Sequence, residues 1–491
     1  MVDLVVLISF NIVLAVTLLV SALQSCERMS NPPSRSDLKS KTIWLANPLA
    51  IYTGTETDAG GGVVVTGPEI IELVPTGAQP RTDISERIDM SEQVLIPGLI
   101  NTHHHFYQTL TRALPAALNK ELFPWLQTLY PVWANLDPDV HRAATRLALA
   151  ELLLSGCTTA SDHHYLFPQN LTDAIDHQVE IGAEMGVRMA MTRGSMSLGK
   201  DQGGLPPNSV VQTEEAILAD SERLVSRYHD SAKFSMSQIA LAPCSPFSVT
   251  TELMRDTALL AEKLDVRLHT HLAETIDEEN FCQQMFGMRT VDYLESVGWL
   301  SNRTWLAHGI HFNSEEIARL GQAGTGICHC PSSNMMLASG ICQVRELEAA
   351  GSPVGLGVDG SASNDCSNMI QELRQAMYIQ RLRYGSVKIT HFDALRWGTA
   401  GSARVLGRED IGTLAVGKAA DIATFKLDEP RFSGAHDPLA ALLLCGAHRA
   451  ESVMVNGVWR VKGGELVDGD IDQIMFEHKC AAQTLAARAT Q

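Results

Sequence analysis

The sequence lacks runs of lysine and arginine, and its cysteines do not follow the spacing of a disulfide framework. Acidic residues outnumber basic ones by 56 to 38, which gives a formal net charge of −18. Because nucleic acid binds to a basic face, no nucleic-acid partner is expected, whereas a small neutral ligand needs only a local pocket. The 10 cysteines are expected to be free thiols in a reducing compartment.

The N-terminal part of the chain is unusual because residues 4–24 form an apolar run that is interrupted mainly by Asn11. Its length suits a membrane span or the apolar region of a signal peptide. The basic residues that normally precede a signal peptide are missing. We expect a cytoplasmic protein, with Met29 as a candidate for the true start, and a membrane anchor through residues 4–24 stays open as the alternative. Residues 1–41 are thus set apart as an apolar segment and a polar linker.

Short apolar strands that end in a polar residue recur along the chain, and helical patterns lie between them. The eight predicted strands cover residues 93–103, 157–163, 187–193, 238–243, 266–271, 304–308, 324–329 and 353–359. Helical patterns include residues 140–154, 213–228, 251–263 and 314–323. This alternation indicates parallel βαβ units, and eight of them predict an α/β fold, a closed (β/α)₈ TIM barrel over residues 97–411.

The regions on either side of the predicted barrel have the patterns of short strands instead. Residues 43–53 and 62–75 precede the barrel, and residues 420–426, 452–456 and 458–461 follow it. Asn456-Gly457 is a strong hairpin signal. Because each flank alone is too small to bury a core, residues 42–96 plus 412–470 are expected to form one small β-sandwich domain. Residues 471–491 are expected to form a C-terminal helix.

Histidines and a carboxylate stand at the ends of the predicted barrel strands. Alternate residues of a strand point to the same side, so His103 and His105 can both face the barrel mouth while His104 faces away. His271 ends another strand, and Asp359 ends the last one. Three neutral nitrogens and one carboxylate form a plausible ligand set that leaves a position open for water, as a catalytic zinc site requires.

Further residues near these strand ends suit proton transfer. Bound Zn²⁺ lowers the pKa of water from 15.7 to about 7, so the site could supply a metal-activated hydroxide that attacks a ring carbon bearing an amine. Asp359 could take the proton of the water, and Glu274 could protonate a ring nitrogen and later the leaving amine. His308 could polarise the substrate or orient the hydroxide. Fe²⁺ or Mn²⁺ would also fit the ligands.

Several motifs together resemble the amidohydrolase superfamily, in the branch of purine, pyrimidine and triazine aminohydrolases. They are Pro97-Gly98 leading to His103 and His105, His271-Leu272-Ala273-Glu274, His308-Gly309, and Asp359-Gly360-Ser361-Ala362-Ser363-Asn364-Asp365. The likeness covers residues 43–470. It implies a single metal ion held by His103, His105, His271 and Asp359, with Glu274 and His308 acting in catalysis. It also implies a homo-oligomer.

The stretch from His105 to Pro115 is similar to 8-oxoguanine deaminases, which convert 8-oxoguanine to urate and ammonia. The alternative is a hydroxyatrazine-type s-triazine N-alkylaminohydrolase or a deaminase of another amino-heterocycle, because these relatives share the same core motifs. A non-catalytic scaffold is disfavoured, since every expected ligand and Glu274 are present.

Three residues are candidates for binding the substrate. Gln108 matches a purine-contacting glutamine of guanine deaminases and offers both donors and an acceptor. Trp125 could cover a flat ring, or it could pack within its own loop. Arg193 could face a carbonyl oxygen of the substrate, or it could form an ordinary salt bridge. No role is assigned to His163, His164 and His329.

Overall fold

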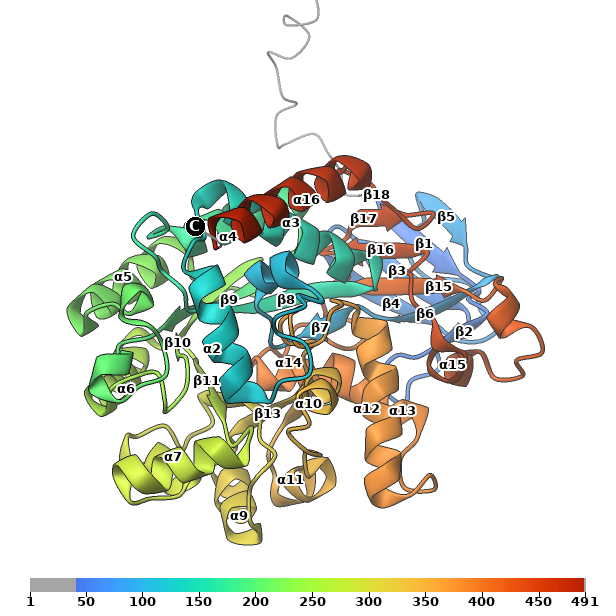
Figure 1. Ribbon diagram of the computed structural model, residues 1–491. Helices are drawn as coiled ribbons and strands as arrows, with labels where there is room; N and C mark the ends of the chain where they lie inside the picture. Colours follow the sequence, from blue (N-terminus) through green and yellow to red (C-terminus); the bar gives the residue numbers. More distant parts are fainter. Residues whose placement is uncertain (1–40, 490–491) are drawn as a thin grey trace, which may run out of the picture. The chain divides into compact units, whose positions relative to one another are not determined.

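The computed structural model describes residues 41–489, and their main feature is an eight-stranded parallel sheet that curves into a barrel (Figure 1). Its strands follow one another in chain order, and each pairs with the next. The first and last strands are joined by hydrogen bonds from the Thr102 amide to the Leu356 carbonyl (3.0 Å) and from the Asp359 amide to the His103 carbonyl (3.1 Å). The predicted (β/α)₈ barrel is therefore confirmed. Its strands are β7 (Leu99–Asn101), β8 (Cys157–His164), β9 (Arg188–Ser195), β10 (Ser237–Pro243), β11 (Leu268–Leu272), β12 (Thr304–His308), β13 (Gly326–His329) and β14 (Val354–Leu356).

Helices connect the barrel strands, as the periodic patterns predicted. The α3 helix begins after Asp137, whose side chain accepts a hydrogen bond from the Val140 amide, and α9 begins with a capping box between Asn313 and Glu316. The main helices are α2 (Leu122–Trp133), α3 (Pro138–Leu154), α4 (Ala174–Met185), α5 (Glu214–Tyr228), α6 (Thr251–Leu264), α7 (Ile276–Phe286), α8 (Thr290–Ser296), α9 (Ser314–Ala323), α10 (Pro331–Met336), α11 (Val344–Ala350), α12 (Met369–Tyr384), α13 (His391–Arg396), α14 (Ser402–Val405), α15 (Pro438–Ala441) and α16 (Ile471–Arg488), with a 3₁₀ turn η1 (Phe106–Thr111).

Two further sheets form a β-sandwich that draws on both flanks of the chain. One sheet has the order β4-β3-β1-β5, and the other has the order β18-β17-β16-β15-β6-β2. Leu45 and Val63 from the first sheet share a buried apolar cluster with Leu95, Ile422 and Met454 from the second. The strands are β1 (Thr42–Ala46), β2 (Ala50–Ile51), β3 (Gly62–Thr66), β4 (Glu69–Val74), β5 (Glu86–Asp89), β6 (Gln93–Pro97), β15 (Ile422–Lys426), β16 (Ser452–Val455), β17 (Val458–Lys462) and β18 (Glu465–Leu466). The hairpin at Asn456-Gly457 joins β16 to β17.

Two predicted strands are in fact pairs of strands. Residues 93–103 are divided at Gly98 into β6, which pairs with β15 in the sandwich, and β7, which pairs with β8 in the barrel. A Cβ atom on Gly98 would lie 2.2 Å from the Thr158 side chain, so only glycine fits where the chain passes between the sheets. Residues 62–75 form the hairpin of β3 and β4, which turns at Gly67 with a φ of 55°.

The C-terminal helix α16 packs against α3 (Figure 1). Among residues 41–489, no helix is both long and apolar enough to cross a membrane. The apolar run at residues 4–24 lies outside the described residues, so the anchor stays a prediction. Every cysteine within the described part of the chain is free, and most of them are buried.

Candidate metal centre and active site

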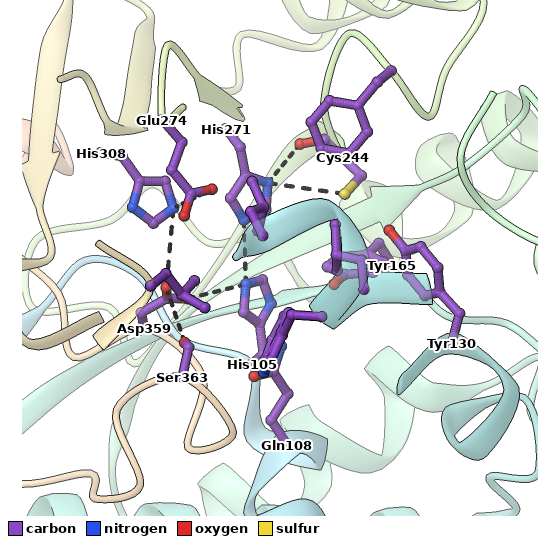
Figure 2. A pocket seen from close by; sticks show the side chains of 15 residues that line it. His105, Gln108, Tyr130, Tyr165, Cys244, His271, Glu274, His308, Asp359 and Ser363 are labelled. Atoms are coloured by element: carbon purple, nitrogen blue, oxygen red, sulfur yellow. Dashed lines mark hydrogen bonds and ion pairs between the residues drawn. The ribbon is translucent and has the colours of Figure 1, made fainter. Parts of the chain in front are cut away.

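The four predicted metal ligands meet at the mouth of the barrel. His103 and His105 follow β7, His271 lies on β11, and Asp359 follows β14. The Nε2 atoms of His103 and His105 lie 3.2 and 3.3 Å from Oδ1 of Asp359. The Nε2 atoms of His105 and His271 are 3.2 Å apart (Figure 2). Three imidazole nitrogens and one carboxylate oxygen thus converge on one point, and His104 instead contacts Ser367.

The other ring nitrogen of each histidine is held by a neighbour. Nδ1 of His105 lies 2.7 Å from the carbonyl oxygen of His163, and Nδ1 of His271 lies 2.6 Å from the carbonyl oxygen of Cys244. A carbonyl only accepts, so each Nδ1 carries the hydrogen and donates it. The lone pair of Nε2 is therefore free and directed at the convergence point, which is the tautomer that a metal ligand needs.

His103 is held by a longer chain of groups. Its Nδ1 lies 2.8 Å from Nε2 of His269, and Nδ1 of His269 lies 2.9 Å from the carbonyl oxygen of Trp305. Since that carbonyl fixes the hydrogen on Nδ1 of His269, the Nε2 of His269 accepts and the Nδ1 of His103 donates. No role was predicted for His269, although its position two residues before His271 places both rings on one side of β11.

The atoms at the convergence point fit a divalent metal ion. Nε2 of His103 is buried and has no hydrogen-bond partner within residues 41–489. Burial holds the pKa of His103 well below its usual value despite the nearby Asp359, so the ring stays neutral. Burial raises the pKa of Asp359, but the side chains of His103 and His105 beside it outweigh burial and hold the pKa well below its usual range. Neutral imidazoles beside an ionised carboxylate are the donor set of a catalytic zinc site.

Two candidate proton-transfer residues face this centre. Nε2 of His308 lies 3.5 Å from Oε2 of Glu274 and 3.9 Å from Oδ2 of Asp359. The Asn334 amide donates to Nδ1 of His308 (2.9 Å), which leaves the hydrogen on Nε2. Burial, followed by the charges of Asp359 and Glu278, raises the pKa of Glu274 well above its usual value, as suits an acid.

Left-handed backbone turns direct these side chains into the site. The φ angles are 72° at His308, 61° at Asp359 and 54° at Ala273, the residue before Glu274. Such angles are uncommon outside glycine and concentrate at functional sites. Each turn occurs where a barrel strand ends, so the chain bends and its polar side chain reaches the cavity.

The cavity beside the centre has a largely aromatic and aliphatic lining. It includes both Gln108 and Trp125, which are buried. A Cβ atom on Gly360 would lie 1.9 Å from Oε1 of Gln108, so a glycine at position 360 leaves room for the side-chain amide of Gln108. The lining residues are His105, Gln108, Leu122, Trp125, Leu126, Tyr130, Tyr165, Cys244, Phe247, His271, Glu274, His308, Leu337, Asp359 and Ser363.

Arg193, a candidate for binding the substrate or for forming an ordinary salt bridge, lies outside the cavity lining. Its Nε atom lies 2.7 Å from Oδ2 of Asp220, with Nη2 at 2.9 Å from Gln212. Its guanidinium also stacks on the ring of Phe167. The ordinary salt bridge is thus the role that the geometry supports, because Asp220 on α5 already satisfies the buried charge.

The three histidines to which no role was assigned form hydrogen bonds with backbone carbonyl groups or with a helix side chain. Nε2 of His163 meets the carbonyl oxygen of Ala242 at 2.9 Å, and Nε2 of His164 meets that of Leu166 at 2.6 Å. Nε2 of His329 accepts from Gln380 at 3.1 Å. None of the three is among the residues that line the cavity.

A family model described as "Amidohydrolase family" matches residues 94–460, which span most of the chain. The chain belongs to the amidohydrolase family. It is 64% identical over 444 residues to an 8-oxoguanine deaminase of Pseudomonas aeruginosa, covering 90% of this chain and 99% of the relative. It is 36% identical over 411 residues to a hydroxydechloroatrazine ethylaminohydrolase of a Pseudomonas species, covering 82% of this chain and 85% of the relative.

The amidohydrolase fold is also seen in a related solved structure. An atrazine chlorohydrolase from Arthrobacter aurescens, complexed with zinc, superimposes with a TM-score of 0.85 at 33% identity, covering 90% of this chain and 100% of that one. The resemblance inferred from the sequence motifs is confirmed. The chain is an amidohydrolase-family enzyme with a histidine and aspartate cluster able to bind a metal ion.

Proposed function

We propose that this amidohydrolase is a deaminase that hydrolyses 8-oxoguanine to urate and ammonia. The observation that carries the proposal is the convergence of the Nε2 atoms of His103, His105 and His271 with the Asp359 carboxylate, next to the buried acid Glu274. The 64% identity to an 8-oxoguanine deaminase supports the choice of substrate. A small-molecule amino-heterocycle as substrate agrees with the mostly apolar cavity that a few polar groups line.

We propose one divalent ion per chain, held by His103, His105, His271 and Asp359. The three nitrogens and one carboxylate favour zinc, and zinc in the related chlorohydrolase supports that choice. When bound, zinc acts as a Lewis acid and lowers the pKa of water to about 7. The three Nδ1 hydrogen bonds keep the rings in place for this role.

The chain's own residues would then move the protons of the reaction. Asp359 accepts a proton from the water that attacks the ring carbon bearing the amine. Glu274, whose pKa is raised by burial, protonates a ring nitrogen, takes up the proton that Asp359 removed from the water, and passes this second proton to the departing amine, which leaves as ammonia. The proton of the new hydroxyl group returns to Glu274 when the carbonyl forms. His308 presents its Nε2 hydrogen to the same space and can stabilise developing negative charge. Gln108 and Trp125 hold the heterocycle.

A panel of substrates tests the proposal against the triazine alternative. The zinc-loaded protein is given 8-oxoguanine, guanine and a hydroxylated N-ethylamino-s-triazine, and the released ammonia or ethylamine is measured. We expect the kcat/KM for 8-oxoguanine to lie in the usual enzymatic range of about 10⁴–10⁸ M⁻¹s⁻¹ and to exceed the other two. A higher kcat/KM for the triazine would overturn the choice of substrate and leave the family unchanged.

A further inference from the structure

The α2 wall of the cavity carries buried polar atoms without partners. Tyr130 and Trp125 both lie on α2 and line the cavity, with 1% and 4% of their surfaces exposed. The hydroxyl of Tyr130 and the indole nitrogen of Trp125 have no hydrogen-bond partner among the described residues. Because buried polar groups in proteins are nearly always paired, two unpaired groups lining one cavity point to a ligand that supplies their partners.

Tyr130 lies at the end of the cavity away from the proposed chemistry. Figure 2 shows Tyr130 and Tyr165 on one side of His105 and His271, and Glu274, His308 and Asp359 on the other. The remaining lining near α2 includes Leu122, Leu126 and Phe247, whose side chains offer no hydrogen bond. A flat substrate whose amine faces Glu274 would therefore direct its far end toward the Tyr130 hydroxyl.

We infer that the Tyr130 hydroxyl selects the substrate by donating a hydrogen bond to an oxygen on the ring that does not react. The inference rests on the proposed function, in which the amine-bearing ring faces Glu274 and the far ring of 8-oxoguanine carries one oxygen. Tyr130 is thus a specificity-determining residue that discriminates a purine with this 8-oxygen from one without it.

Two further observations favour an acceptor oxygen as the partner. Burial raises the pKa of Tyr130 well above its usual value, so the hydroxyl keeps its hydrogen and can donate. The indole of Trp125 on the same helix has a hydrogen to donate and no lone pair to accept with. A ring oxygen has two lone pairs, so it could satisfy such donors, whereas an amine or a C–H edge could not.

Binding of two ligands that cannot be deaminated tests this inference separately from turnover. Urate and xanthine both lack the amine, and urate differs by the oxygen at carbon 8. Their dissociation constants are measured by calorimetry with the zinc-loaded full chain and with its Tyr130→Phe variant. Loss of one hydrogen bond predicts about tenfold weaker binding of urate and unchanged binding of xanthine.

The matched control is Tyr293→Phe, which removes the same atom from another buried, unpaired hydroxyl that lies on α8 outside the cavity lining. This control should leave both affinities unchanged. Equal weakening of urate and xanthine by Tyr130→Phe, or weakening of neither, would overturn the inference. Absence of ammonia release from 8-oxoguanine by the wild type would instead overturn the proposed function, while the urate comparison still decides the role of Tyr130.

Discussion

Asp359→Ala is expected to lose both the bound metal and the deaminase activity. Its Oδ1 lies within 3.3 Å of the Nε2 atoms of His103 and His105, and Asp359 is the carboxylate of the proposed ligand set. The variant also loses the proton acceptor for water. Since metal catalysis supplies several kcal/mol, we expect kcat/KM to fall by about 10³-fold or more. Metal content by atomic emission, together with ammonia release, checks the expectation.

Asp365→Ala is the matched control for Asp359→Ala. Asp365 belongs to the same loop after β14, but its carboxylate accepts from the Ala113 amide and does not reach the three histidines. The Asp365→Ala protein should therefore keep its bound zinc. A fully active, zinc-loaded Asp359→Ala protein would show that the ligand is misplaced, whereas metal loss in both variants would assign the effect to the loop.

Glu274→Gln is expected to keep the metal and to lose turnover. The glutamine has the same shape and could still contact His308, but it has no acidic proton to pass to a ring nitrogen. Because general acid catalysis contributes roughly 10²–10⁴-fold, kcat should fall by that order. The KM for 8-oxoguanine should change little, since Glu274 is not one of the ligands or part of the α2 wall. Steady-state kinetics and zinc content measure both effects.

The control for this variant is Glu279→Gln on α7, which neutralises another buried carboxylate. Glu279 pairs with Arg289 at 2.9 Å and does not line the cavity. Its turnover should stay near that of the wild type. Near-normal turnover in Glu274→Gln would remove Glu274 from the mechanism.

The convergence of the proposed metal ligands could be predicted from the sequence because strand geometry is regular. Alternation along a strand predicted that His103 and His105 share a side, and barrel topology brought them to His271 and Asp359. The left-handed turns at His308 and Asp359 were not predictable, since such angles arise from tertiary packing rather than from local preference.

The residues that bind the substrate were harder to predict because they come from elements that are distant in the sequence. Arg193 carried a plausible charge, but its partner Asp220 becomes visible only when α5 packs against β9. No sequence pattern indicated a binding role for Tyr130, since an aromatic residue in a helix is usually part of the core. Two structural features distinguish it from Trp133 on the same helix. Tyr130 lines the cavity and its buried hydroxyl has no partner among the described residues, whereas the indole nitrogen of Trp133 donates to Thr111.

Titration of the metal-free protein with zinc tests the central claim most directly. The rate of ammonia release from 8-oxoguanine is followed as zinc is added, and urate is identified as the product. We predict negligible release without metal and a linear rise that ends at one zinc ion per chain. Full release by the metal-free protein, or none at any zinc concentration despite bound metal, would contradict the claim that this centre hydrolyses 8-oxoguanine.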